Sequence, residues 1–227
     1  MLIFKRLAQI SAPPLILGGA SWTYNTRNTH FIPLTPTSPT YPSTAVKKYN
    51  PSSNPPVCVD HAIREVPLSR LRTTDVEELT REFCRGIWGG VGFEVQRRYL
   101  ERKWRGLEGR EGMLWEREEL KKGDYEVGTR IADHFEVVER GVDRVVIRCG
   151  DSPLITGPRN SDGVFAMEVT TEGDVAKFHL KSVFFDSTPD GAKGGSLPAH
   201  IEFLHREYTK LWMETSVRKL VKERWMD

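Results

Sequence analysis

Four β-type segments between residues 125 and 186 decide the fold: YEVGTRIADHFEVVE (125–139), DRVVIRC (143–149), GVFAMEVTT (163–171) and DVAKFHLKSVFFD (174–186). They are rich in Val, Ile, Phe and Thr, which fit a pleated sheet. The connections ERGVD and TEGD are short and turn-like, so the strands are expected to form an antiparallel meander. The Gly- and Pro-rich stretch between the second and third segments is longer, as functional loops often are.

The elements before the meander are a strand and three helical stretches. A strand is predicted over 57–66, where Val and Ile provide apolar anchors. Thr74 then caps a helix with acidic residues in its first turn and a Gly pair at its end. A second helix is expected over 91–105 and a short helical turn over 114–121.

The last segment predicts a long helix that begins at Pro198 and runs to about Arg224. Tyr208 and Leu211 belong to its apolar side, and Glu214 to its polar side. The predicted fold class is therefore α+β, with the strand, two helices, the four-strand meander and the C-terminal helix packed across a curved antiparallel sheet. The wedge between such a helix and sheet is often incompletely filled and can hold a ligand.

Composition excludes several classes of protein. The chain has 227 residues and a net charge of +2, which gives no reason to expect nucleic-acid binding. No run of eighteen apolar residues predicts a transmembrane helix. The three cysteines are odd in number and far apart, which argues against a disulfide framework and a cysteine-rich zinc site. The absence of HExxH, GxGxxG and GxxxxGK[ST] patterns leads us to expect no metal and no cofactor.

Residues 1–56 differ from the remainder of the chain, because the first acidic residue is Asp60. Segment 33–56 is rich in Pro, Ser and Thr, so we expect a disordered linker before a folded domain at 57–227. Residues 1–30 are basic and hydroxyl-rich, as in a mitochondrial presequence, but a secretory signal and an unprocessed tail stay open. The expected location is mitochondrial, or otherwise cytoplasmic.

Three stretches carry a resemblance to a known superfamily: YEVGTRIADHFEVV, KSVFF and IEFLHREYTKLW. Their order over residues 57–223 resembles the helix-grip (SRPBCC) superfamily of polyketide cyclases, START-like lipid carriers and plant pathogenesis-related proteins. It resembles more closely an uncharacterised bacterial domain family often fused to epimerase-like domains. The helix of that family carries Phe-His-Arg, where this chain has Leu204, His205 and Arg206. The resemblance implies an apolar ligand between sheet and helix, which relatives carry, cyclise, dehydrate or isomerise.

His205, Tyr208 and Trp212 share one face of the last helix, at helical spacings. A neutral imidazole near a bound carbonyl can act as a general base, with the Tyr208 phenol as proton donor. The alternative is that His205 packs on Trp212 at the edge of the surface. Asp133 alternates with Phe135 onto the apolar side of its strand, where a carboxylate with a raised pKa would suit proton transfer. The alternative is a bulge that returns Asp133 to water.

The expected cavity wall includes further residues of the meander. Phe135, Phe184 and Trp212 supply aromatic surface, although a purely structural role is open for each. Cys149 follows its strand onto the apolar face and is a core or cavity-wall residue rather than a nucleophile. Asp151 lies at the strand end, where it caps the long loop or lines the cavity mouth.

Two functions follow from these expectations. The first is a cofactor-independent cyclase, isomerase or dehydratase that acts on a small aromatic or polyketide-like molecule. The second is a non-catalytic carrier of a lipid or quinone. In both the partner is a small apolar molecule, and the sequence leaves substrate and oligomeric state open.

Overall fold

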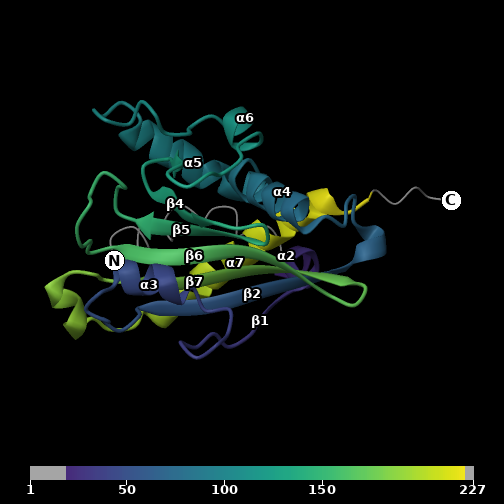
Figure 1. Cartoon of the computed structure of the whole chain (residues 1–227), viewed down its shortest axis with the longest axis horizontal. Helices are drawn as coiled ribbons and strands as arrows, with labels where there is room; N and C mark the ends of the chain where they lie inside the picture. The colour runs from purple at the N-terminus through teal and green to yellow at the C-terminus, as the bar shows by residue number, and fades with distance from the viewer. Residues whose placement is uncertain (1–18, 223–227) are drawn as a thin grey trace.

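The computed structural model describes residues 19–222, and these form an α+β fold built on one seven-stranded antiparallel sheet. The strand order is β1-β2-β7-β6-β5-β4-β3, and the sheet is curved (Figure 1). The strands are β1 (Thr29–Phe31), β2 (Cys58–Pro67), β3 (Arg130–Ile131), β4 (Phe135–Arg140), β5 (Arg144–Gly150), β6 (Asp162–Glu172) and β7 (Val175–Phe185). The predicted antiparallel meander corresponds to β4–β7.

Alternation along the strands divides the side chains between two faces of the sheet. On β6 and β7, Phe165, Met167, Phe178 and Leu180 are buried in the larger apolar core. The residues that alternate with them, such as Val164 and Ala166, point to the opposite face and a second, smaller core. Both faces of the central strands are therefore covered, and long apolar runs replace a simple alternation of apolar and polar residues.

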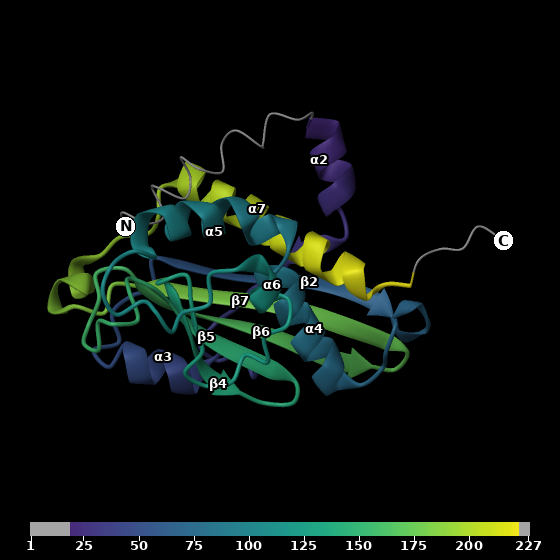
Figure 2. The ribbon, with the colours of Figure 1, turned by 90° about the horizontal axis from the view of Figure 1, so that it is seen from above.

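Three helices cover the larger core: α4 (Val76–Trp88), α5 (Val91–Trp104) and α7 (Ala199–Val217). α5 and α7 lie side by side over the sheet in Figure 2. The N-cap of α4 is Asp75, one residue after the expected Thr74, and its carboxylate accepts a hydrogen bond from the Glu78 amide. A single turn, α6 (Arg117–Leu120), follows α5. In the part of the chain that the structure covers, no helix is long and apolar enough to cross a membrane.

An ion pair and a close backbone approach fix the position of α7. Arg64 of β2 lies 2.7 Å from the carboxylate of Glu214, and both side chains are buried. A Cβ placed on Gly86 of α4 would lie 2.7 Å from the Cβ of Ser216, so only glycine allows the two helices to approach this closely. α7 ends at Val217, and a 3₁₀ turn over Arg218–Leu220 follows it, so the described helix is shorter than predicted.

The N-terminal segment covers the outer side of α7, which the sequence pattern assigned to solvent. Thr29 of β1 donates a hydrogen bond of 2.9 Å to Glu214, and Trp22 of α2 (Gly19–Thr26) donates one to Glu207. Glu214 is therefore buried and not exposed as predicted. Residues 1–18 of the expected targeting segment, like residues 223–227, lie outside the described residues.

Segment 33–56, expected to be a disordered linker, instead contains a helix packed on the domain. α3 (Ser43–Tyr49) lies on the face of the sheet opposite α7 (Figure 2). Its Ala45 is buried in the smaller core, with apolar residues of β5, β6 and β7. The polar composition of the segment hid this contact, because only a few of its side chains are needed to cover the sheet.

The same face of the sheet buries polar groups in pairs. The imidazoles of His61 and His179 lie 3.0 Å apart, nitrogen to nitrogen, and His179 also lies 2.9 Å from the Thr170 hydroxyl. Lys181 donates to Glu168 at 2.8 Å, and neither side chain has appreciable exposure. These pairs satisfy groups that would otherwise destabilise the sheet.

Candidate functional site

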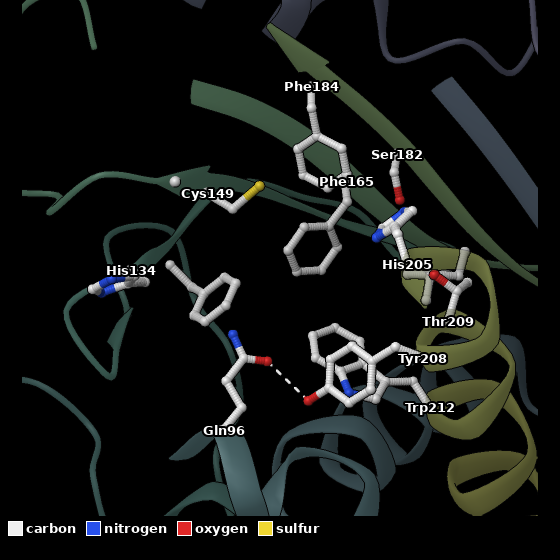
Figure 3. A pocket seen from close by; sticks show the side chains of 13 residues that line it. Gln96, His134, Cys149, Phe165, Ser182, Phe184, His205, Tyr208, Thr209 and Trp212 are labelled. Atoms are coloured by element: carbon white, nitrogen blue, oxygen red, sulfur yellow. Dashed lines mark hydrogen bonds between the residues drawn. The ribbon is translucent and has the colours of Figure 1, made fainter. Parts of the chain in front are cut away.

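A cavity lies between the sheet, α5 and α7 (Figure 3). Its volume is about 70 Å³, counted as the space open to the centres of water molecules. This is room for roughly five water-sized groups, or one small ring. Thirteen residues line it: Gln96, His134, Phe135, Cys149, Gly150, Phe165, Leu180, Ser182, Phe184, His205, Tyr208, Thr209 and Trp212.

Alternate positions of the meander strands supply the floor of the cavity. Phe135, Cys149, Phe165 and Phe184 line the cavity from the core side of the sheet, and the side chains of the last three can be followed in Figure 3. The Phe135 and Phe165 rings lie 6.0 Å apart at 77°, an edge-to-face contact. The floor is therefore largely aromatic, and its rings are held by contacts with one another.

α7 supplies the opposite wall through side chains that succeed one another at helical spacing. The Trp212 ring lies 6.1 Å from Phe165 and 5.2 Å from Tyr208. The Tyr208 hydroxyl donates to the side-chain oxygen of Gln96 on α5 at 2.9 Å (Figure 3). Burial raises the pKa of Tyr208. The phenol is therefore held protonated and directed toward Gln96, with only its oxygen lone pairs left to a bound molecule.

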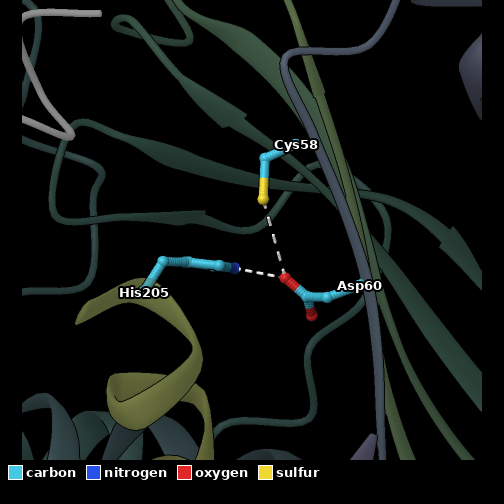
Figure 4. Close-up of side chains that lie close together, drawn as sticks. All are labelled: Cys58, Asp60 and His205. Atoms are coloured by element: carbon cyan, nitrogen blue, oxygen red, sulfur yellow. Dashed lines mark hydrogen bonds and ion pairs between the residues drawn. The ribbon is translucent and has the colours of Figure 1, made fainter. Parts of the chain in front are cut away.

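The most polar feature of the wall is His205, whose Nε2 lies 2.5 Å from an Asp60 carboxylate oxygen (Figure 4). The Asp60 side chain has no exposed surface, and that of His205 is 12% exposed. The Phe184 ring and the imidazole lie 5.2 Å apart, centroid to centroid, and are nearly perpendicular. A carboxylate that orients an imidazole at the edge of an apolar cavity is a common arrangement for a proton acceptor.

Cys58 lies beside this pair, because it precedes Asp60 by two residues on β2 and shares its face of the sheet. Its sulfur is 4.0 Å from the same carboxylate oxygen (Figure 4). Burial, and then the Asp60 charge, raise the pKa of the Cys58 thiol to about 12. Without a further cation the thiol therefore stays protonated and is a poor nucleophile. One donor atom from each of Cys58, Asp60 and His205 falls within a span of 4.8 Å.

The structure brings together six of the eight residues that the sequence indicated. These six line the cavity: His205, Tyr208, Trp212, Phe135, Cys149 and Phe184. The two acidic candidates, Asp133 and Asp151, do not line it. Asp151 instead accepts a hydrogen bond from the Ser161 amide and closes the loop between β5 and β6.

Asp133 does not lie in a strand, since the predicted 125–139 strand is broken between β3 and β4. Ala132 and Asp133 adopt left-handed conformations, with φ of 48° and 56°. This reverses the chain and removes Asp133 from the alternation that placed it over the cavity. Its carboxylate accepts a hydrogen bond from Ser152 and pairs with Arg110 at 3.2 Å. Asp133 therefore stabilises a turn, and its interactions give it no part in the cavity.

Several polar residues of the site were not indicated by the sequence pattern: Asp60, Gln96, His134, Ser182 and Thr209. Asp60 alternates with Cys58 and Ala62 on the buried face of β2. An acidic residue at a buried position of a strand is a signal that the alternation of β2 alone could have revealed. Its partner His205 is 145 residues away, so the pair itself depends on the tertiary fold. Gln96 follows no pattern that distinguishes it from other polar residues of α5.

Comparison of the chain with protein-family models, with curated proteins and with solved structures gives no match. The functional interpretation is therefore based on the cavity and its side chains.

Proposed function

We propose that the protein binds a small, largely apolar molecule, about the size of one ring, in the cavity between the sheet and α7. The observation that carries this proposal is a cavity walled by Phe135, Phe165, Phe184 and Trp212, with His205 as a polar group at its edge. An apolar pocket with a few polar groups that fix orientation is the usual form of a small-molecule site. The long helix packed across a curved antiparallel sheet is compatible with the helix-grip resemblance, which stays part of this proposal.

The His205–Asp60 pair favours a catalytic form of this function. A ligand hydroxyl or an acidic C–H near the imidazole could transfer its proton to His205, while Asp60 orients the ring and stabilises the imidazolium. Such a step suits cofactor-independent isomerisation, cyclisation or dehydration. Tyr208 would not supply the proton in this scheme, because its hydroxyl is directed at Gln96.

The second candidate function is that of a carrier for an apolar molecule such as a lipid or quinone. It is favoured by the mutual hydrogen bond of Tyr208 and Gln96, which reduces the polarity of the wall. The cavity volume of about 70 Å³ means that such a ligand would place only one ring or chain end inside.

The proposal is tested by adding single-ring phenols and ketones to the full chain. Calorimetry and thermal unfolding measure whether they bind. We expect at least one compound to bind and to raise the unfolding temperature. A Leu180→Phe variant, which adds volume in the cavity wall, should weaken binding, while Val142→Thr at an exposed position should not. Absence of binding across the set, or equal binding by Leu180→Phe, would contradict the proposal. Turnover lost in His205→Gln with binding retained would distinguish enzyme from carrier.

A further inference from the structure

Asp60 is an unusual residue for its position, because it lies on the face of β2 that packs on the larger apolar core. Its side chain is fully buried, and Oδ1 has no hydrogen-bond partner among residues 19–222. A buried carboxylate oxygen without a partner costs on the order of 1–3 kcal/mol. Such groups in folded proteins commonly indicate a bound water or ion.

The residues around Asp60 offer three donor types, one sulfur, one nitrogen and one oxygen. The side chains of Cys58 and Asp60 extend from β2 toward His205 on α7 (Figure 4). The sulfur and the imidazole nitrogen lie 4.0 Å and 2.5 Å from Asp60 Oδ2, and the three atoms span at most 4.8 Å. This set is distinct from a cluster of acids, which would offer oxygen alone.

These distances can be compared with those around a tetrahedral zinc ion. Zinc binds nitrogen and oxygen at about 2.0 Å and sulfur at about 2.3 Å, which separates neighbouring ligand atoms by roughly 3.3–3.6 Å. The sulfur–oxygen and nitrogen–oxygen separations fall on opposite sides of that range. Side-chain rotations that move the ligand atoms by about 1 Å would therefore bring all three onto one ion. Cys, His and Asp are also the residues that zinc prefers, whereas Ca²⁺ and Mg²⁺ require oxygen ligands.

Charge balance favours the same ion. When bound, a Cys58 thiolate and the Asp60 carboxylate together carry a charge of −2, which Zn²⁺ neutralises, and His205 stays neutral. A cluster with no net charge is less costly to bury than a carboxylate that has only neutral neighbours. Glu202 and Arg206 of α7 act on Cys58 with opposite charges and pair with each other at 3.1 Å, so they leave this balance unchanged.

We propose that Cys58, Asp60 and His205 bind one Zn²⁺ ion at the edge of the cavity. Three ligands from the protein leave a fourth coordination position, as in zinc sites that bind water or substrate. Since His205 lines the cavity, this position would be available to a hydroxyl or carbonyl of the bound molecule, a consequence that rests on the proposed function. With Zn²⁺ on Nε2, the imidazole could no longer act as the proton acceptor, and the metal would act as a Lewis acid instead. The metal-ligand role and the proton-acceptor role of His205 therefore exclude one another.

Titration of the EDTA-treated full chain with Co²⁺ tests the site directly, because a cobalt–thiolate bond gives a charge-transfer absorption in the near ultraviolet. We expect this band at one equivalent of Co²⁺ and its loss when Zn²⁺ is added. Cys58→Ser should abolish the band, and His205→Gln should weaken Co²⁺ binding at least tenfold. Cys84→Ser is the matched control, since Cys84 is a buried thiol of α4 outside the cluster, and it should retain the band.

The proposal is wrong if the wild-type chain gives no thiolate–cobalt band, a result that does not depend on how any variant folds. It is also wrong if the band persists in Cys58→Ser or disappears in Cys84→Ser while circular dichroism shows both variants folded. Binding of single-ring compounds is measured on the EDTA-treated wild-type chain, because the aromatic wall of Phe135, Phe165 and Trp212 needs no metal. Loss of the metal and loss of the apolar ligand can thus be observed separately.

Discussion

Replacing Glu214 with Gln tests whether the buried ion pair fixes α7 above the cavity. The substitution preserves the shape of the side chain but removes the charge that faces Arg64 at 2.7 Å. Both side chains are at least nine-tenths buried, so the Arg64 guanidinium would be left in the interior without a counter-ion. Breaking one partner of such a pair costs about 3–5 kcal/mol. Thr29 can still donate to the amide oxygen of the substituted side chain, so we expect a loss at the lower end, about 3 kcal/mol.

Urea unfolding followed by far-ultraviolet circular dichroism measures this loss as a lower midpoint with an unchanged slope. The double variant Arg64→Met/Glu214→Leu should recover most of the stability, because apolar side chains of similar size can replace a buried ion pair. Glu118→Gln is the control for an exposed pair and should leave the unfolding midpoint almost unchanged. A loss below about 1 kcal/mol for Glu214→Gln would refute the role assigned to the pair.

Three further predictions concern other parts of the fold. Burial, and then the Lys181 charge, lower the pKa of His61 to about 4 and of His179 to about 3. Both stay neutral in the folded protein while the unfolded chain takes up protons below about pH 6.5, so stability is complete above that pH and falls toward pH 4. Unfolding measured by urea at pH 7.5 and pH 5 should differ by on the order of 2 kcal/mol per histidine, and His61→Asn should reduce the difference. Gly86→Ala should destabilise the protein by about 1–3 kcal/mol through overpacking of the α4–α7 contact, and an unchanged thermal midpoint would contradict that packing. Asp133→Asn, which keeps a residue tolerant of positive φ, should cost about 1–2 kcal/mol of stability and leave ligand affinity unchanged; a large loss of affinity would restore Asp133 to the site.

Residue patterns predicted the α+β class and the positions of β2, β5, β6, β7, α4 and α5, because apolar spacing along one element reports its own buried face. The same argument predicted the site residues of α7. Helical spacing places His205, Tyr208 and Trp212 on one face, whatever that face packs against. Asp60 was missed as the partner of His205 because no local pattern connects two residues on different elements.

Local patterns failed where another part of the chain changes the surroundings of a residue. Glu214 occupies a polar position of an amphipathic pattern, yet α7 is covered on that side by the N-terminal segment. The left-handed turn at Asp133 contains no glycine, so the sequence showed no break in the strand. Segment 33–56 has the composition of a linker, but a short helix within it contributes Ala45 to the smaller core.

A crystal structure of the full chain soaked with a single-ring phenol tests most directly whether the space between the sheet and α7 is a ligand site. We expect density for the ring in the cavity lined by Phe135, Phe184 and Trp212, with the phenol oxygen directed toward His205. Density for the compound only at the surface, or a cavity filled by the protein's own side chains, would contradict this assignment.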